Sequence, residues 1–175
     1  MTKVARDPFE GFACKLGDVV IRSGGDEAWL AGAMVLAEDA PVAAVFIAPE
    51  AGADRAVYAR AKDAALVWMA AADDAVSSGA EPPSVVEIGT VRFERQRRLP
   101  LRVQRLGSGT PDVGERAIVA EYTAAGGERL VMLIGSGGRR AWRGFALEPG
   151  MYDVLPGGAT DVAAGVEDRD VRKSK

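Results

Sequence analysis

Short apolar stretches separated by glycine, proline and acidic residues run through most of the chain. They are rich in valine, isoleucine and aromatic residues, which is typical of β-strands between tight turns. The pattern predicts strands over 16–22, 27–36, 42–48, 55–60, 65–69, 85–94, 99–106, 116–122, 129–134, 140–147 and 152–155. The short connections between these stretches favour an antiparallel meander.

Two regions depart from this pattern. Residues 53–74 hold many alanines, and because alanine is the best helix former, a helix over about 54–72 is the alternative to strands there. Residues 71–84 become small and polar, with Pro82 and Pro83 unable to donate backbone hydrogen bonds. This composition predicts a linker over 71–84.

The chain also matches itself when it is shifted by 74 residues. The identities are Val45 with Val119, Ala51 with Ala125, Gly52 with Gly126, Arg55 with Arg129, Val57 with Val131 and Trp68 with Trp142. We therefore predict two tandem related antiparallel β-meander units, over 12–70 and 85–158, packed into one compact body and followed by a flexible tail over 159–175. In the second unit the glycines at 126–127 and 135–138 favour hairpin turns, so the repeat favours strands in the alanine-rich region too.

Composition limits the chemistry that this all-β scaffold can carry. Histidine is absent and Cys14 is the only cysteine, which excludes Ser-His-Asp and Cys-His catalytic sets, thiolate clusters and an internal disulfide. We predict no catalytic residues, no metal site and no cofactor. An enzyme would need two carboxylates that converge in a cleft, because such a pair requires no histidine.

Charge and hydropathy indicate a globular protein of the cytoplasm. Hydrophobic residues make up 48% of 175 residues, enough for a core, and no apolar run approaches the ~20 residues of a membrane span. Lys3 and Arg6 near the first residue are not followed by an apolar run, so we expect neither export nor membrane insertion. The formal net charge of −3 offers no general attraction to nucleic acid, so any such binding needs a local patch.

Two glycine-rich motifs resemble nucleotide-binding signatures. Gly24-Gly25-Asp26-Glu27 matches part of the diguanylate cyclase motif, but too little chain precedes it and Ala28 stands where that motif has phenylalanine. The sequence GSGGRR over 135–140 lacks the Gly-Lys-Ser ending of a phosphate loop and precedes a predicted strand rather than a helix. Both motifs are therefore predicted to be hairpin turns.

The strongest local charge is a run of six arginines between positions 92 and 105. Because a strand alternates faces, and Pro100 interrupts the run, charges that protect a solvated strand edge are the alternative to a binding patch. We predict that Arg97, Arg98 and Arg102 form a basic edge and that Trp29 is an aromatic anchor for a partner. Trp29 is preferred because it has no aromatic counterpart in the second unit, whereas the two repeat-matched tryptophans indicate core packing.

Several short motifs resemble a known bacterial family. They are Leu16-Gly17-Asp18, Trp29-Leu30-Ala31-Gly32, Arg98-Leu99-Pro100-Leu101-Arg102-Val103, Val119-Ala120-Glu121-Tyr122, Trp142-Arg143-Gly144 and Tyr152-Asp153-Val154-Leu155-Pro156-Gly157. Together they are similar to the family catalogued as domain of unknown function 4178. The resemblance implies a duplicated β-sandwich or barrel-like module without established catalysis, and it supplies no site residues.

These observations favour a non-catalytic binding or adaptor module. We expect it to recognise a protein partner through an exposed strand edge or an aromatic and basic face. The alternative is a binder of an anionic small ligand, or of single-stranded nucleic acid, in a groove between the two repeats.

Overall fold

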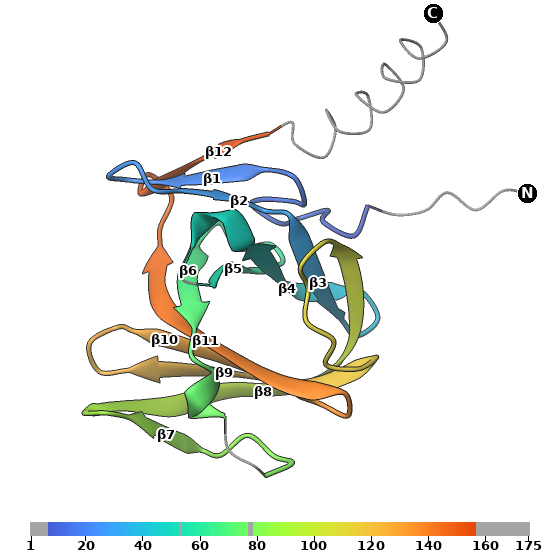
Figure 1. Ribbon diagram of the computed structural model, residues 1–175, viewed down its shortest axis with the longest axis vertical. Helices are drawn as coiled ribbons and strands as arrows, with labels where there is room; N and C mark the ends of the chain where they lie inside the picture. Colours follow the sequence, from blue (N-terminus) through green and yellow to red (C-terminus); the bar gives the residue numbers. More distant parts are fainter. Residues whose placement is uncertain (1–6, 53, 77–78, 157–175) are drawn as a thin grey trace, which may run out of the picture.

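The computed structural model describes residues 7–52, 54–76 and 79–156, and these residues form an all-β protein (Figure 1). The prediction of the fold class is confirmed at this level. The strands are β1 (Val19–Arg22), β2 (Glu27–Trp29), β3 (Gly32–Ala37), β4 (Pro41–Ala48), β5 (Arg55–Arg60), β6 (Leu66–Ala71), β7 (Val85–Ile88), β8 (Val91–Gly107), β9 (Arg116–Ala124), β10 (Arg129–Gly135), β11 (Gly138–Leu147) and β12 (Tyr152–Leu155). Two short 3-10 turns accompany them, η1 (Pro49–Ala51) and η2 (Asp73–Ala75).

Eight of these strands close into a barrel. Their order is β3-β4-β5-β6-β11-β10-β9-β8, and β8 pairs back onto β3 to complete the circle. The alanine-rich region forms strands β5 and β6, so the helical alternative for 54–72 is wrong. Alanine lowers the cost of a helix, but here both faces of these strands are buried against other parts of the molecule, and packing decides the outcome.

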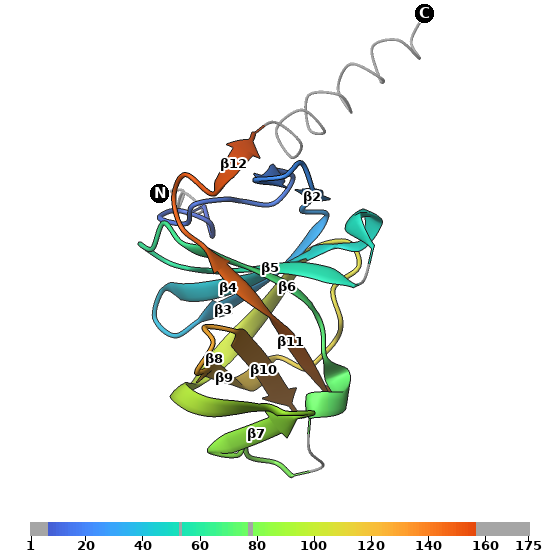
Figure 2. The same cartoon turned by 90° about the vertical axis from the view of Figure 1, so that its left-hand side faces the viewer.

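The barrel wall is packed on both sides. Inward-facing side chains such as Met34, Val45 and Leu133 form one core cluster in the barrel interior. A three-stranded sheet, β12-β1-β2, packs on the outside of β3–β6 around Phe46 and Trp68. On the opposite side β7 packs outside β8–β11, so Figure 2 shows the barrel between two outer layers.

The register of β8 joins the two halves of the chain. One edge of β8 pairs with β9, whereas the other edge pairs with β7 at its beginning and with β3 at its end. A bulge between Arg95 and Arg97 reverses the faces, so Phe93 points outward and Leu101 points inward. The strand runs through Pro100, so the predicted break between 94 and 99 is wrong.

Two further boundaries differ from the prediction, and the first is that the turn at Gly89 and Thr90 divides the predicted strand 85–94 between β7 and β8. The stretch 27–36 is not one strand: it breaks at Leu30 and Ala31, where the chain passes from the outer sheet into the barrel. Both residues are apolar and buried, so the pattern gave no sign of a turn. The two glycine-rich motifs do form hairpin turns, between β1 and β2 and between β10 and β11, as predicted.

The ranges of the two predicted units contribute to one barrel. Strands β3–β6 of the first range and β8–β11 of the second share a single barrel, and the predicted linker 71–84 includes the end of β6 and the turn η2. The predicted tail over 159–175 lies outside the described residues. No helix in the described ranges is long and apolar enough to cross a membrane.

Candidate functional site

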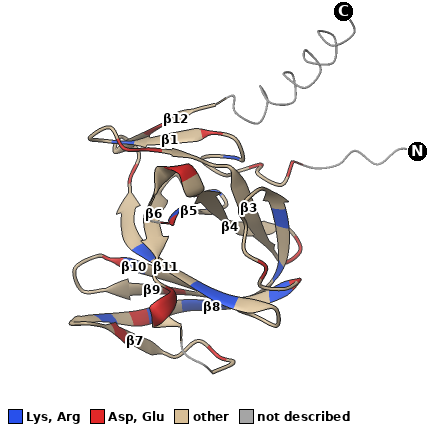
Figure 3. Cartoon of the chain, in the orientation of Figure 1, with Lys and Arg blue, Asp and Glu red and all other residues tan. Residues whose placement is uncertain are grey.

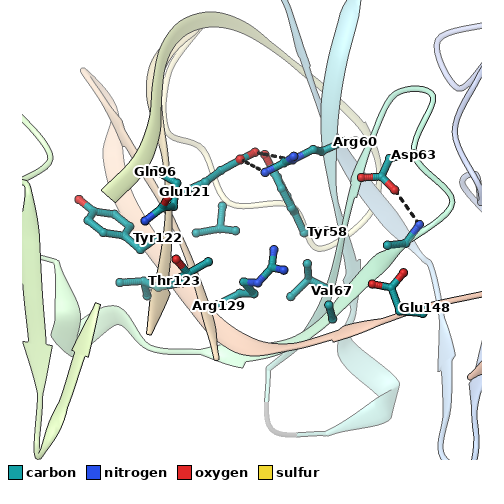
Figure 4. A pocket seen from close by; sticks show the side chains of 14 residues that line it. Tyr58, Arg60, Asp63, Val67, Gln96, Glu121, Tyr122, Thr123, Arg129 and Glu148 are labelled. Carbon is teal, nitrogen blue, oxygen red and sulfur yellow. Dashed lines mark hydrogen bonds and ion pairs between the residues drawn. The ribbon is translucent and has the colours of Figure 1, made fainter. Parts of the chain in front are cut away.

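One mouth of the barrel holds a pocket of about 220 Å³ (Figure 4). It is formed by residues of six barrel strands, β5, β6, β8, β9, β10 and β11, and of the turns beside them. Its polar lining includes Tyr58, Arg60, Asp63, Gln96, Glu121, Thr123, Arg129 and Glu148. Because the barrel closes by pairing between the two halves of the chain, this pocket takes residues from both.

Glu121 of β9 is the buried charge of the pocket. It is only 7% exposed, and its carboxylate accepts hydrogen bonds from the Tyr58 hydroxyl and from Nε (3.2 Å) and Nη2 of Arg60. Nη1 of Arg97 lies 3.7 Å from the same carboxylate. Two guanidinium groups and one phenol therefore compensate this charge, as a buried carboxylate requires.

The protonation states of this group follow from its environment. Burial, and then the charge of Glu121, raise the pKa of Tyr58 well above its ordinary value, so its hydroxyl remains a donor at neutral pH. Burial acts to lower the pKa of Arg60, but Glu121 more than offsets this and the pKa is raised. Tyr58, Arg60 and Glu121 thus form a fixed hydrogen-bonded network in the wall of the pocket.

Arg129 of β10 is the exception in this pocket. Its Nε–H is buried and donates to no acceptor, and its guanidinium has no hydrogen bond or ion pair with any described residue. Figure 4 shows the guanidinium pointing into the pocket. Arg55, which aligns with Arg129 at the shift of 74 residues, also has a buried Nε without a partner, but it donates from Nη1 to the Met69 carbonyl at 2.9 Å and lies over the Trp68 ring. Arg129 is therefore a buried donor left for an acceptor from outside.

The residues predicted for partner contact lie on different surfaces. Trp29 is 38% exposed, on β2 in the outer sheet. Arg97 points into the barrel mouth toward Glu121, whereas Arg98 points outward and pairs with Glu81 at 2.6 Å. Arg102 donates to the Glu38 carbonyl. The structure places Arg97 beside Glu121 of the pocket lining, but it does not gather these four side chains on one face.

The basic run lies on a partly unpaired strand edge. Figure 3 shows the blue of lysine and arginine recurring along β8. On the edge facing away from β9, β7 pairs with residues 91–94, the Arg95 N–H donates to the Ser84 carbonyl and β3 pairs with 102–107, so no described strand pairs with 96–101 there. Pro100 and the arginines on this stretch are residue types that protect a free edge from further pairing.

Sequence reasoning missed Tyr58, Arg60, Glu121 and Arg129. Glu121 carried a usable signal, because it is a single charge inside the apolar run Ala117–Tyr122 and such a charge needs a partner. Its partners lie more than 60 positions earlier in the chain, at residues that only barrel closure brings near. Nothing in the sequence distinguished Arg129 as a site residue, because it aligns with Arg55, which has a structural role.

The described residues contain no group of three or more acidic or cysteine side chains placed to share a metal ion. The class defined by the fold and the pocket is a closed antiparallel β-barrel with a polar pocket in one mouth. Comparisons with family models, curated proteins and solved structures give no match for this chain. The resemblance to the family of unknown function 4178 stays a prediction.

Proposed function

We propose that the protein binds a small ligand with a carboxylate or phosphate group in the barrel mouth. The unpaired guanidinium of Arg129 is the single observation that carries the proposal. A buried polar group without a partner is costly, and an ionised acid that fills the pocket would remove this cost. Arginine suits this task because its planar fork matches carboxylate and phosphate oxygens.

The rest of the pocket supports a small ligand. Its volume of about 220 Å³ is below the ~300–1,000 Å³ typical of sites for drug-sized molecules. Glu121 is held by Tyr58, Arg60 and Arg97, so its charge is compensated before any ligand arrives. These residues act as a rigid wall that positions the ligand beside Arg129.

The proposal is tested by titrating the protein with small monocarboxylates and with inorganic phosphate in a calorimeter. We expect at least one acid to bind, with Arg129→Leu abolishing binding and Arg129→Lys weakening it. Arg116→Leu, which removes an exposed arginine from the outer surface, is the matched control and should bind as the wild type does. Binding that survives Arg129→Leu, or that no acid shows, overturns the proposal.

The predicted recognition of a protein partner has one supporting observation, the free edge of β8. The Val103 N–H donates to the Glu115 carbonyl on the β9 side, so the backbone groups of the alternate residues Arg98 and Pro100 face the unpaired edge. An extended acidic segment could add there as a strand, with its side chains close to Arg98.

This second candidate is tested with an array of acidic, strand-forming peptides. Arg98→Pro removes the backbone donor of the edge, whereas Arg98→Ala removes only the side chain. Loss of binding in the proline variant alone supports strand addition. Equal binding by both variants and the wild type rejects it. Charge reversal at Arg97 is unsuitable, because Arg97 pairs with Glu121 in the barrel.

We also propose that the two halves of the barrel are related by duplication. The hairpins β5–β6 and β10–β11 support this, because Val57 pairs with Trp68 just as Val131 pairs with Trp142. Both pairings lie at the predicted shift of 74 residues. On this interpretation the pocket lies between the two repeats, and the matched side chains face opposite sides of the barrel wall, because Val57 and Trp68 pack in the outer cluster and Val131 and Trp142 in the interior.

A further inference from the structure

The pocket carries unpaired negative charge as well as the positive charge of Arg129. Asp63 lies in the turn between β5 and β6, and Glu148 follows the end of β11. Both line the pocket with Arg129, and Figure 4 shows them together on one side of it. A ligand held by Arg129 would therefore face these two carboxylates.

Both carboxylates act on one further group, the Tyr152 hydroxyl. Tyr152 donates its hydroxyl to the Ala64 carbonyl within the same turn. Burial raises the pKa of Tyr152, and the charges of Cys14, Asp63 and Glu148 raise it further.

Both carboxylates keep acceptor atoms available. Oδ1 of Asp63 accepts the Ala65 N–H at 2.9 Å, which fixes the orientation of the carboxylate, while Oδ2 has no hydrogen-bond partner among the described residues. The Glu148 carboxylate has no hydrogen bond or ion pair within the described ranges. A donor with several N–H groups could bind between them.

Charge balance then selects the ligand. Arg60 and Arg129 line the pocket with two positive charges and Asp63, Glu121 and Glu148 with three negative ones, and Arg97, which pairs with Glu121 from outside the lining, balances the third. A purely anionic ligand would leave the filled pocket negative, with its acid group close to two carboxylates. A ligand with one acid and one ammonium group keeps the pocket neutral and gives each unpaired side chain an opposite charge.

We infer that the ligand is zwitterionic, a small amino acid whose acid group binds Arg129 and whose ammonium group binds Asp63 and Glu148. This inference rests on the proposed function, because it adds a second anchor to the same site. Two side-chain carboxylates are too few for a dedicated calcium site, which takes six to eight oxygens, so an organic cation suits them better.

The test compares matched ligands in a calorimeter at neutral pH. The probes are unbranched ω-amino acids of two to six carbons, the same acids without the amino group, and the same amino acids with the amino group acetylated. We expect the amino acid of one chain length to bind about tenfold more tightly than the acid of the same length without the amino group, and about tenfold more tightly than its acetylated form. The double variant Asp63→Asn and Glu148→Gln should lose this preference, while Arg129→Leu should lose all binding.

The substitutions at 63 and 148 are chosen so that the variant protein stays folded. Asparagine at 63 can still accept the Ala65 N–H, and Glu148 is exposed, so thermal unfolding should stay close to that of the wild type. If the double variant unfolds early, Glu148→Gln alone is used and should reduce the preference. If acids bind through Arg129 with no preference for the amino group, the zwitterion inference is overturned and the proposed function stands. If no acid binds at all, both are overturned.

Discussion

Glu121 and Arg129 face the same pocket from neighbouring strands, but only Glu121 has side-chain partners that compensate its charge. In the antiparallel register Glu121 lies opposite Val131, so Arg129 is its diagonal neighbour on the same face. Diagonal neighbours of opposite charge commonly pair. Here Tyr58 and Arg60 occupy the acceptors of Glu121, and Arg129 is left without a partner. The network thus leaves the Arg129 guanidinium without a partner.

Removing the Tyr58 hydroxyl tests how tightly Glu121 is held. Tyr58→Phe deletes a hydrogen bond to a buried carboxylate, so we expect the free energy of unfolding in urea to fall by about 1.5–3 kcal/mol. Tyr152→Phe deletes a hydrogen bond to an exposed turn and should cost clearly less. Equal losses in the two variants would mean that the Glu121 network adds nothing special to stability.

The buried thiol of Cys14 predicts a loss of stability in alkali. Burial, with a smaller effect of Asp18, raises its pKa to about 12 from an ordinary value of 9.0. Between these values the folded chain keeps a proton that the unfolded chain has lost, so stability falls as the pH rises from about 9 toward 12. From pH 8.5 to 10.5 the wild type should lose about 2 kcal/mol more than Cys14→Ala, measured by urea unfolding. Parallel losses would show that the thiol ionises equally in both states.

At the scale of elements, the barrel depends on two seams between the halves of the chain. Strand β6 meets β11 at one seam, and β3 meets β8 at the other. Glycine lies at both: a Cβ on Gly144 would collide with the Trp68 carbonyl, and a Cβ on Gly32 with the Ser108 carbonyl. The strands approach there more closely than a side chain allows.

Gly144→Ala should therefore damage the fold. The colliding atom belongs to the backbone of a central strand and cannot move aside, so we expect a loss of at least about 3 kcal/mol in the free energy of unfolding. The control is Gly126→Ala in the turn between β9 and β10, where a Cβ meets nothing within 4 Å. A Gly144→Ala protein as stable as this control would contradict the close seam.

The strands could be predicted from the sequence wherever turn residues separate them. The prediction for 55–60 matches β5 because the glycines of the second half favoured a strand over the alanine-rich alternative. The break at Leu30 could not be predicted, since a chain that passes between two buried layers stays apolar throughout. Pro100 suggested a strand end, but it lies on the edge of β8 that needs no donor.

At the scale of the whole molecule, the pocket exists only in the closed barrel. Tyr58 and Arg60 come from the first half, and Glu121 and Arg129 from the second. Sequence reasoning placed a groove between the two halves but assigned it the arginines of β8, of which Arg97 alone reaches the pocket network. Barrel register decides which charges meet, and no local pattern encodes that register.

A barrel with two interlocked halves should unfold in one step. Trp68 on β6 and Trp142 on β11 report on the first and the second half. We expect that a variant keeping only Trp68 and one keeping only Trp142 each show a fluorescence transition that coincides with its own far-UV circular dichroism transition in urea. Separate transitions would show that the halves fold as independent units.

The central claim is that the barrel mouth binds a small acid through Arg129. The most direct measurement is the NMR signal of the Arg129 Nε–H group during titration with the acids and amino acids named above. We expect this signal to shift, and its hydrogen to exchange more slowly with solvent, as the ligand binds. The Nε–H signal of Arg55, which is buried elsewhere, should not shift. An unmoved Arg129 signal at millimolar concentrations of every acid would contradict it.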